Sequence, residues 1–249
     1  MSESAVTAAV LVIGDEVLSG RTQDANTHYI ANYLSQIGVD LREARVVPDV
    51  EEEIVAAVNA LRARYAYVFT TGGIGPTHDD ITADAIARAF GVEIDEDPRA
   101  LAMLRERFAE ADLNPARRRM ARIPEGAALI PNAISKAPGF WIGNVIVMAG
   151  VPSVMHAMLD TVGPQLRTGR RILVESVAAG SIPEGAYAAG LAEIVRAHAD
   201  VSIGSYPSFT SEGVRNQIVL RSRDAEALAQ AVAEARALID GLASLAGRR

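Results

Sequence analysis

The sequence predicts an α/β protein with a doubly wound, mostly parallel sheet, followed by a smaller C-terminal α+β domain. Two observations indicate the larger part: apolar runs that end in glycine, as in strands buried on both faces, and helical patterns that alternate with these runs. The third observation is the segment 161–171, which contains glycine and proline and precedes a region where two strands follow one another directly. We therefore expect domains at residues 1–165 and 170–249.

The larger domain is expected to begin with a strand at 7–13, a continuous apolar run that ends at Gly14. The helix expected at 25–37 can be capped by Asp24, and Gly38 ends its pattern. Strands and helices that alternate at this spacing specify right-handed crossovers and a parallel sheet covered on both faces. The same reasoning predicts strands at 41–47 and 67–71 and helices at 50–64 and 80–90.

The middle of the chain is less regular, and the smaller domain follows it. The middle pattern predicts helices at 97–110 and 151–159, a short basic turn of helix at 115–120, and a hairpin over 140–148. In the smaller domain we expect strands at 172–177, 201–205 and 216–222 and helices at 184–198 and 224–242. This βαββα order is typical of a small α+β domain.

Composition and charge exclude several classes of function. The chain has 249 residues, 49% of them hydrophobic, and no cysteine, which excludes disulfides, iron–sulfur clusters and thiolate metal sites. Its net charge of −7 makes nucleic acid and anionic membranes unfavourable partners. The acidic N-terminus does not resemble a signal peptide, and no apolar run approaches the roughly 20 residues of a membrane span. We therefore expect a cytoplasmic protein.

Ligands of open α/β sheets bind beyond the carboxyl ends of the strands, so the loop after the third predicted strand is a candidate site. This loop contains Gly72, Gly73 and Gly75, whose N–H groups can hold a phosphate, with the positive end of a helix dipole behind them. It lacks the third glycine of the dinucleotide fingerprint and the lysine of a P-loop. A phosphate site is therefore expected, but neither a dehydrogenase nor a P-loop ATPase.

Carboxylates follow these glycines and would repel a phosphate. The pair Asp79 and Asp80 therefore predicts a divalent cation, which accepts carboxylate oxygens on one side and phosphate oxygens on the other. Asp15 or Glu16, from the loop after the first strand, can complete such a metal site. Each acid also has a structural interpretation: Asp80 can cap the helix that follows, and the acids after the first strand can form an exposed turn.

Basic residues offer further contacts for an anion. Of the 24 basic residues, only Lys136 is a lysine, and its compact ammonium group would contact a phosphate differently from a guanidinium group. The composition of the source genome explains this single lysine equally well. The run 117–119 and the nearby Arg122 form either a solvated basic face or a phosphate clamp.

These motifs resemble the MoaB/Mog molybdopterin-binding family, and more closely its CinA-like branch. The resemblance covers roughly residues 7–160, and it implies a MoaB/Mog-type fold for the larger domain. Residues 172–242 resemble the small domain that follows this module in CinA-like proteins and in eukaryotic FAD synthases. The matching segments are Gly14-Asp15-Glu16-x-Leu18-x-Gly20, Asn26, 71–82, 132–141 and Gly150-Val151-Pro152.

The resemblance implies one of three functions. CinA-like and FAD-synthase-linked modules are associated with divalent-metal-dependent hydrolysis of a nucleotide pyrophosphate, of the ADP-ribose or FAD type, with Mg, Mn or Co. Mog proteins bind molybdopterin and adenylylate it with Mg-ATP. A non-catalytic regulatory module is the third alternative, because Val154 stands where CinA-like proteins have glutamate. The Asp79-Asp80 pair and the closer branch favour hydrolysis.

The resemblance also implies the site residues and a homo-oligomer, either a trimer or a dimer. Asn26 can instead be a second helix cap, and Thr82 can merely support the first turn of its helix. The expected catalytic residues and metal ligands are Asp15, Asp79 and Asp80. The residues expected to bind a nucleotide or pterin phosphate are Gly14, Glu16, Asn26, Thr71, Gly72, Gly73, Gly75, Thr77, Thr82, Lys136, Pro138 and Gly139.

Overall fold

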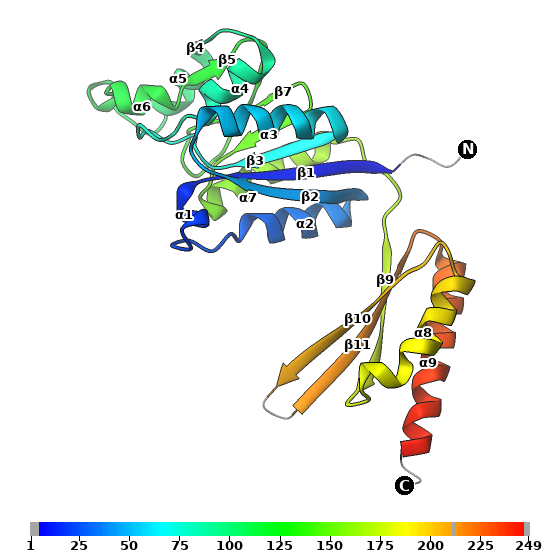
Figure 1. Ribbon diagram of the computed structural model, residues 1–249. Coiled ribbons are helices and arrows are strands. Elements are labelled where there is room, and N and C mark those ends of the chain that lie inside the picture. Colours follow the sequence, from blue (N-terminus) through cyan, green and yellow to red (C-terminus); the bar gives the residue numbers. More distant parts are fainter. Residues whose placement is uncertain (1–4, 211–212, 247–249) are drawn as a thin grey trace. The chain divides into compact units, whose positions relative to one another are not determined.

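The computed structural model describes residues 5–210 and 213–246 (Figure 1). The chain divides into two compact units between Gly169 and Arg170. Two clusters of buried apolar side chains belong to the first unit, and a third belongs to the second unit. Because each core is formed within one unit, the two units are described separately.

The first unit contains a six-stranded sheet in the order β2-β1-β3-β8-β7-β6. β7 (Gly139–Ile142) is antiparallel to β8, and β6 (Ala128–Ile130) is antiparallel to β7. The predicted hairpin that turns at residues 143–144 is therefore present, and the mostly parallel sheet is confirmed. Four neighbouring strands run parallel: β1 (Val6–Ile13), β2 (Val39–Val47), β3 (Tyr67–Thr71) and β8 (Val145–Met148).

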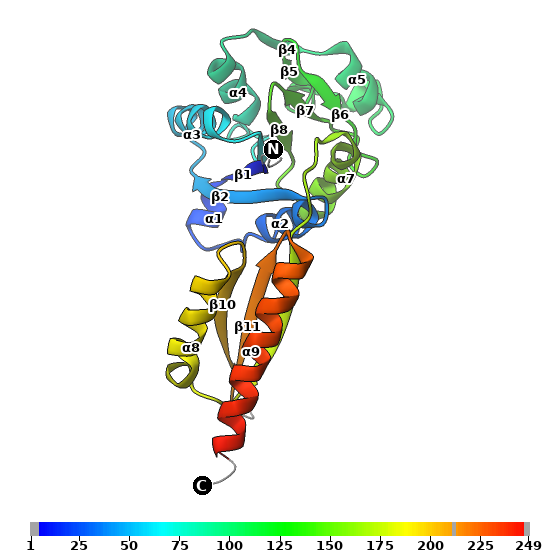
Figure 2. The same cartoon turned by 90° about the vertical axis from the view of Figure 1, so that its right-hand side faces the viewer.

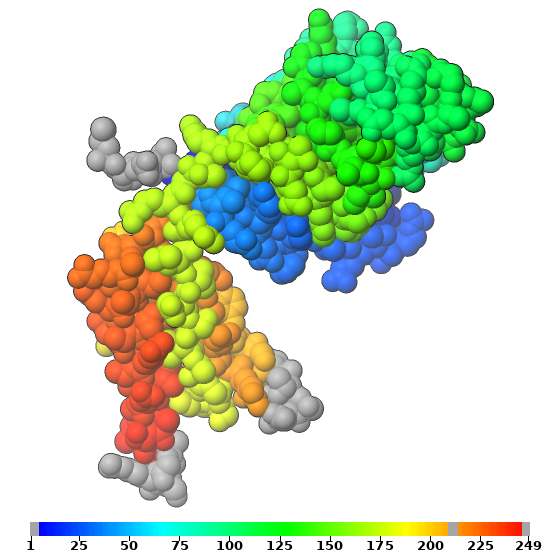
Figure 3. Space-filling view, turned by 180° about the vertical axis from the view of Figure 1, so that it is seen from behind, coloured from blue at the N-terminus to red at the C-terminus, as the bar shows by residue number. Residues whose placement is uncertain are grey.

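Helices cover both faces of this sheet, as expected for a doubly wound fold. Alternate residues of β1 point to opposite faces: Val10 and Val12 lie in one buried cluster, whereas Leu11 and Ile13 lie in the other. Figure 1 shows α2 and α3 on opposite sides of the sheet, and α2 and α7 lie side by side (Figure 3). The helices are α2 (Asn26–Gln36) and α7 (Pro152–Val162) on the first face, and α3 (Glu51–Arg64) and α4 (Thr82–Phe90) on the second.

Helix α4 begins at Thr82, two residues later than the sequence pattern predicts. The Oδ2 atom of Asp80 accepts hydrogen bonds from the N–H group of Thr77 at 2.8 Å and from its hydroxyl group at 2.6 Å. This carboxylate closes the turn 77–80 and makes no hydrogen bond to the first turn of α4. The interpretation of Asp80 as a helix cap is therefore wrong.

Residues 91–130 contain strands that the sequence pattern did not indicate. β4 (Ile94–Glu96) pairs antiparallel with β5 (Arg122–Pro124), and both are too short for alternation to reveal them (Figure 2). The helix predicted at 97–110 ends early, as α5 (Pro98–Arg105), because the chain turns into extended backbone at Ala109. The remaining short elements are α1 (Asp15–Leu18), η1 (Glu110–Asp112), α6 (Pro115–Arg119) and η2 (Gly163–Gln165).

The second unit has the βαββα order that the sequence predicts. Its three strands form an antiparallel sheet in the order β10-β11-β9, and its core includes Tyr187, Ile218 and Leu220. Within the described residues, no helix combines the length and the apolar character needed to cross a membrane. The elements are β9 (Leu173–Gly180), α8 (Glu184–Ala197), β10 (Ser202–Thr210), β11 (Gly213–Ser222) and α9 (Ala225–Ala246).

Candidate functional site

The carboxyl ends of four parallel strands meet at one edge of the first unit's sheet. Ile13 of β1 lies opposite Val47 of β2, while Val12 lies opposite Thr71 of β3, which in turn lies opposite Met148 of β8. The loops that follow these strands therefore emerge side by side. Most of the residues that the sequence singled out lie in these loops.

Steric contacts explain two glycines in the loop after β3. Gly72 and Gly73 have φ values of +106° and +67°, which favour glycine. A Cβ atom on Gly72 would overlap the carbonyl oxygen of Ile13, and one on Gly73 would overlap the hydroxyl group of Thr82. The buried Thr82 donates from Oγ1 to the Gly72 carbonyl at 3.0 Å and from its N–H group to the Gly73 carbonyl at 3.0 Å. Thr82 thus holds the loop against the start of α4.

The same loop presents backbone donors to solvent. In the part of the chain that the structure describes, the N–H groups of Gly73, Ile74 and Gly75 have no acceptor. These three residues are partly buried and lie beside the N-terminus of α4. Free amides of a glycine-rich loop, close to the positive end of a helix dipole, suit the oxygens of a phosphate.

Thr77 organises the acidic end of this loop. Besides closing the turn through Asp80, its hydroxyl group is the largest cause that lowers the pKa of the neighbouring Asp79. A backbone N–H group and the charge of His78 lower the pKa of Asp79 further. Because its pKa is lowered, the Asp79 carboxylate is ionised at neutral pH. Its side chain is 60% exposed and is therefore open to a ligand.

Acidic side chains from three loops interact at this edge. The N–H group of Asp15 donates to Oδ2 of Asp49 at 3.0 Å, which joins the loop after β1 to the loop after β2. Burial raises the pKa of Asp49, the bond from Asp15 lowers it, and the charges of Asp15, Glu16 and Asp79 raise it again. The charges of these four carboxylates therefore influence one another at the edge of the sheet from which the glycine loop also emerges.

Asp49 is not among the residues predicted from the sequence, although its position directly after a strand indicates it. Asp49 follows Pro48 at the end of β2, just as Asp15 follows Gly14 at the end of β1. The N–H group of Gly14 donates to the carbonyl of Val47 at 3.1 Å, so the two strand ends are held together. The rule that directed attention to the loops after the first and third strands applies equally to the loop after the second.

The donor set fits a cation that binds together with a substrate. Within residues 5–210 and 213–246, no three His, Asp or Glu side chains are already arranged around a metal position. Mg²⁺ and similar cations often bind through only one or two carboxylates, with water and substrate phosphates as the other ligands. The carboxylates of Asp15, Asp49 and Asp79 supply hard oxygen donors of this kind.

Asn26 connects two of the loops. Its side chain is buried, and its Nδ2 atom donates to the carbonyl of Gly150 at 2.8 Å, while its Oδ1 atom finds no hydrogen-bond partner among the residues that the structure describes. Gly150 packs directly on Gly72, and the nearby Thr71 hydroxyl is also buried without a partner. The cap of α2 is Asp24, which accepts from the N–H groups of Asn26 and Thr27. Asn26 is therefore a link between loops and not a second cap.

The structure does not bring all residues of the segment 132–139 to this edge. The ammonium group of Lys136 lies 2.6 Å from Oε2 of Glu106, and Lys136 is the only residue other than glycine with a positive φ among the described residues. Gly139 packs against the carbonyl of Val147, where a Cβ atom would not fit. Pro138, in contrast, lines a small pocket beside the glycine loop.

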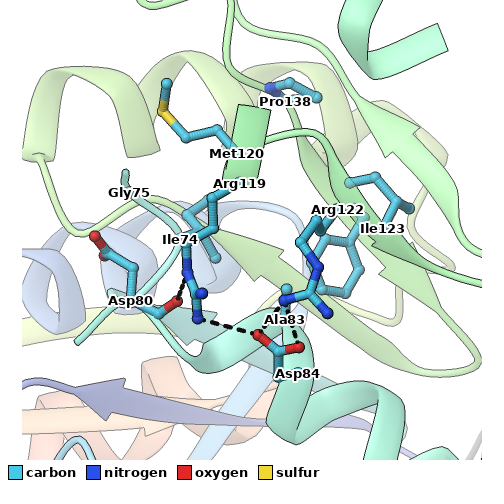
Figure 4. Close-up of a pocket in the computed structure, with 12 residues that line it drawn as sticks. Ile74, Gly75, Asp80, Ala83, Asp84, Arg119, Met120, Arg122, Ile123 and Pro138 are labelled. Carbon is cyan, nitrogen blue, oxygen red and sulfur yellow. Dashed lines mark hydrogen bonds and ion pairs between the residues drawn. The ribbon is translucent and has the colours of Figure 1, made fainter. Parts of the chain in front are cut away.

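This pocket also contains two arginines (Figure 4). Arg119 donates from Nε to the carbonyl of Asp80 at 3.1 Å, and its Nη2 atom lies 3.2 Å from Oδ2 of Asp84. Arg122 lies 2.7 Å from the other oxygen of the same carboxylate. With a volume of about 10 Å³ the pocket has room for about one water molecule.

Comparisons with known proteins agree with this fold. Residues 9–168 match the family described as "Probable molybdopterin binding domain", and residues 175–244 match "FAD synthase, middle domain". A protein of Caldivirga maquilingensis is 37% identical over 208 residues, which are 80% of this chain and 81% of that protein. A crystal structure described as the protein CinA with unknown function, from Thermoplasma acidophilum, has a TM-score of 0.62 and 36% identity, and covers 66% of this chain and 99% of that one.

The glycine loop at the edge of a doubly wound sheet thus defines a domain of the molybdopterin-binding class. The chain belongs to this family. Among its relatives is a CinA-like protein of Citrifermentans bemidjiense, 46% identical over 170 residues, or 65% of this chain and 41% of that protein. The chain therefore spans about four-tenths of the length of that relative. The predicted resemblance to MoaB/Mog and CinA-like proteins is confirmed.

Proposed function

We propose that the first unit is a divalent-metal-dependent hydrolase of a nucleotide pyrophosphate, of the ADP-ribose or FAD type. The observation that carries this proposal is the group of four carboxylates, Asp15, Glu16, Asp49 and Asp79, beside the unpartnered N–H groups of the glycine loop. By themselves, the carboxylates would repel a phosphate that the N–H groups attract. A divalent cation between the carboxylates and the phosphate resolves this conflict.

In this proposal one or two of the carboxylates of Asp15, Asp49 and Asp79 would hold the cation, which is Mg, Mn or Co, and water and substrate phosphate oxygens would be its other ligands. When bound, the cation polarises the phosphate oxygens and offsets the charge that develops on them. Asp80 acts differently from the sequence prediction, because its carboxylate is engaged by Thr77. Its role is to keep the turn 77–80 closed and thereby to position Asp79.

Hydrolysis adds one water molecule across the P–O–P linkage. The oxygen of the water forms the new bond to one phosphorus, and the bridging oxygen leaves with the other phosphate. At neutral pH a proton is released to solvent. The N–H groups of Gly73, Ile74 and Gly75 would bind a non-bridging oxygen of the phosphate that is attacked, where negative charge increases during the reaction.

The second unit supports a nucleotide as the substrate. Its match to a domain of FAD synthase connects the chain with an enzyme named for a flavin dinucleotide, which contains a pyrophosphate. The match alone assigns no role to residues 175–244. It favours FAD and related dinucleotides as the first compounds to test.

The experiment is a turnover assay of the complete chain with ADP-ribose and FAD in the presence of Mg, Mn or Co. We expect mononucleotide products to form, and we expect EDTA to abolish their formation because it removes the metal. Asp79→Asn and Asp49→Asn should each reduce turnover by about 100-fold or more, because each removes a charge that holds the cation. Chromatography of the nucleotides measures both outcomes.

A matched control is Asp240→Asn, which changes an exposed carboxylate on α9 of the second unit. Its turnover should equal that of the unaltered chain. If ADP-ribose and FAD stay intact with each of the three metals, the proposal is wrong.

A second function, binding or adenylylation of molybdopterin, is favoured by the match of residues 9–168 to a molybdopterin-binding family. The same phosphate site would then hold the pterin phosphate. Calorimetry with molybdopterin, and release of pyrophosphate from Mg-ATP in its presence, would identify this function. Tight binding without any turnover would instead identify a regulatory module.

Val154, the residue that motivates the regulatory alternative, is buried in the core between α2 and α7. A glutamate at this position would need a partner or a different packing.

We also propose that the chain forms a homo-oligomer, a dimer or a trimer, as the family resemblance implies. Light scattering at several concentrations measures its mass.

A further inference from the structure

A second hollow lies beside the glycine loop and is distinct from the carboxylates described above. It is a groove of about 540 Å³, and we call it the arginine groove. A volume of this size is typical of small-molecule sites. Its polar lining residues are Thr77, His78, Glu96, Arg118, Arg119 and Arg122.

Local structure explains why arginines gather here. Asn114 caps the short helix α6 by accepting from the N–H group of Arg117, and the last turn of this helix presents Arg118 and Arg119. Arg122 begins β5, directly opposite Glu96 of β4. The two elements therefore direct three guanidinium groups toward the loop after β3.

The charges of the groove differ from those of the whole chain. Arg118 forms an ion pair with Glu96, whereas Arg119 and Arg122 share the single carboxylate of Asp84. The lining of the groove contains three arginines and one acid, Glu96, in a chain whose net charge is −7. Asp84 and Asp80 lie beside the arginines and offset part of their charge, and an anion that enters the groove is attracted by the guanidinium groups.

The arginines are held in place but keep unused donors. The side chains of Arg119 and Arg122 are each 30% exposed. Among the described residues, the Nε and Nη2 atoms of Arg122 have no acceptor, because its hydrogen bond runs from Nη1 to Asp84. A planar guanidinium group with two free donors matches two oxygens of a phosphate.

The groove is also adjacent to the proposed phosphate site. Arg119 and Arg122 line both the groove and the small pocket that contains Gly73, Gly75 and Asp80. Figure 4 shows Arg119 beside Asp80, and Asp84 between the guanidinium groups of Arg119 and Arg122. A molecule with two adjacent phosphates could therefore contact the glycine loop with one phosphate and the arginines with the other.

We propose that Arg119 and Arg122 bind the second phosphate of the substrate, with Asp84 as the anion that occupies them when no ligand is present. This inference rests on the proposed function for its substrate, a nucleotide pyrophosphate. The phosphate displaces Asp84 from one or both guanidinium groups. The contact of Asp84 therefore opposes binding, and the arginines favour it.

The test uses two substitutions that should act in opposite directions. Arg122→Gln should weaken binding of inorganic pyrophosphate by about tenfold and raise KM by a similar factor, because it removes a charge-assisted hydrogen bond. Asp84→Asn should tighten binding, because it removes the competing carboxylate. Calorimetry with inorganic pyrophosphate and the turnover assay measure the two effects, and binding should weaken as salt increases.

Two further variants separate binding from folding. Arg122→Lys keeps the charge but loses the paired donors, so its affinity should lie between those of the unaltered chain and Arg122→Gln. Arg64→Gln is the control, because Arg64 is exposed, pairs with Glu43 and lines neither hollow, so the change should not affect affinity. Thermal unfolding of each variant checks that it is folded.

The outcomes distinguish this inference from the proposed function. If no pyrophosphate substrate is hydrolysed but Arg122→Gln still weakens pyrophosphate binding, the arginine site stands and the hydrolase is wrong. If the chain hydrolyses its substrate and Arg122→Gln leaves both KM and pyrophosphate affinity unchanged, the arginine site is wrong. The site is also wrong if Asp84→Asn weakens binding as much as Arg122→Gln, or if pyrophosphate does not bind at all.

Discussion

Residues of the glycine loop that are close in sequence have separate tasks. Gly72 permits the close approach of the loop to β1, and Thr82 holds two of its carbonyl groups. Asp80 closes a turn with Thr77, which leaves Asp79 as the carboxylate that is open to a ligand. A motif that appears uniform in sequence thus contains one residue for packing, two for support and, in our proposal, one that binds the cation.

The packing role of Gly72 predicts a large loss of stability in Gly72→Ala. The added Cβ atom would overlap a backbone oxygen, which cannot move aside as a flexible side chain can. We expect the free energy of unfolding to fall by about 3 kcal/mol or more, and the loop to lose its phosphate-binding geometry. Urea unfolding, followed by the fluorescence of Trp141, measures this loss.

Gly126→Ala is the matched control for this prediction. Gly126 also has a positive φ, +79°, but open space surrounds the position of its missing Cβ atom. Its substitution should cost only about 1 kcal/mol, the usual penalty of a left-handed conformation. Equal losses in the two variants would show that overlap with Ile13 is unimportant.

Between elements, Glu43 joins the edge strand β2 to the end of α3. The hydroxyl group of Tyr65 donates to Oε2 of Glu43 at 2.7 Å, and Nε of Arg45 donates to Oε1 at 2.5 Å. These bonds lower the pKa of Glu43, with the bond from Tyr65 as the largest cause. The ionised carboxylate is therefore the form that the fold favours.

This lowered pKa predicts a pH-dependent contribution to stability. When the folded pKa lies below the unfolded value, the contribution is complete above the unfolded pKa and is lost as pH falls through the folded pKa. Glu43→Gln should therefore be less stable than the unaltered chain at neutral pH, and the difference should shrink in acid. Urea unfolding at a series of pH values measures it, and a difference independent of pH would contradict the prediction.

At the scale of the whole molecule, each unit has a core made from its own residues. All candidate site residues lie before the division after Gly169. We therefore expect a fragment of residues 1–169 to fold alone, with the same midpoint of unfolding, followed through Trp141, as in the complete chain. A fragment that is unfolded, or that melts far earlier, would show that the second unit stabilises the first.

The sequence by itself determined the order of the main elements, the parallel sheet and the loop that presents free N–H groups. These features follow from local patterns. A buried strand such as 67–71 is an apolar run, and a glycine-rich loop is recognised directly from its residues. Boundaries failed where a side chain bonded locally, as Asp80 does with Thr77. Short strands such as β4 and β5 also escaped detection, because three residues show no alternation.

Only the tertiary structure decided which side chains share a site. Asp49 accepts a hydrogen bond from Asp15, 34 positions away in the sequence. Lys136 forms an ion pair with Glu106, and Arg122 forms one with Asp84. The physical reason is that charge and hydrogen bonding act over a few ångströms, whereas a sequence pattern reports only on neighbours along one strand or helix. The sequence therefore predicted a phosphate loop and carboxylates near it, and the fold selected the acids and arginines that surround it.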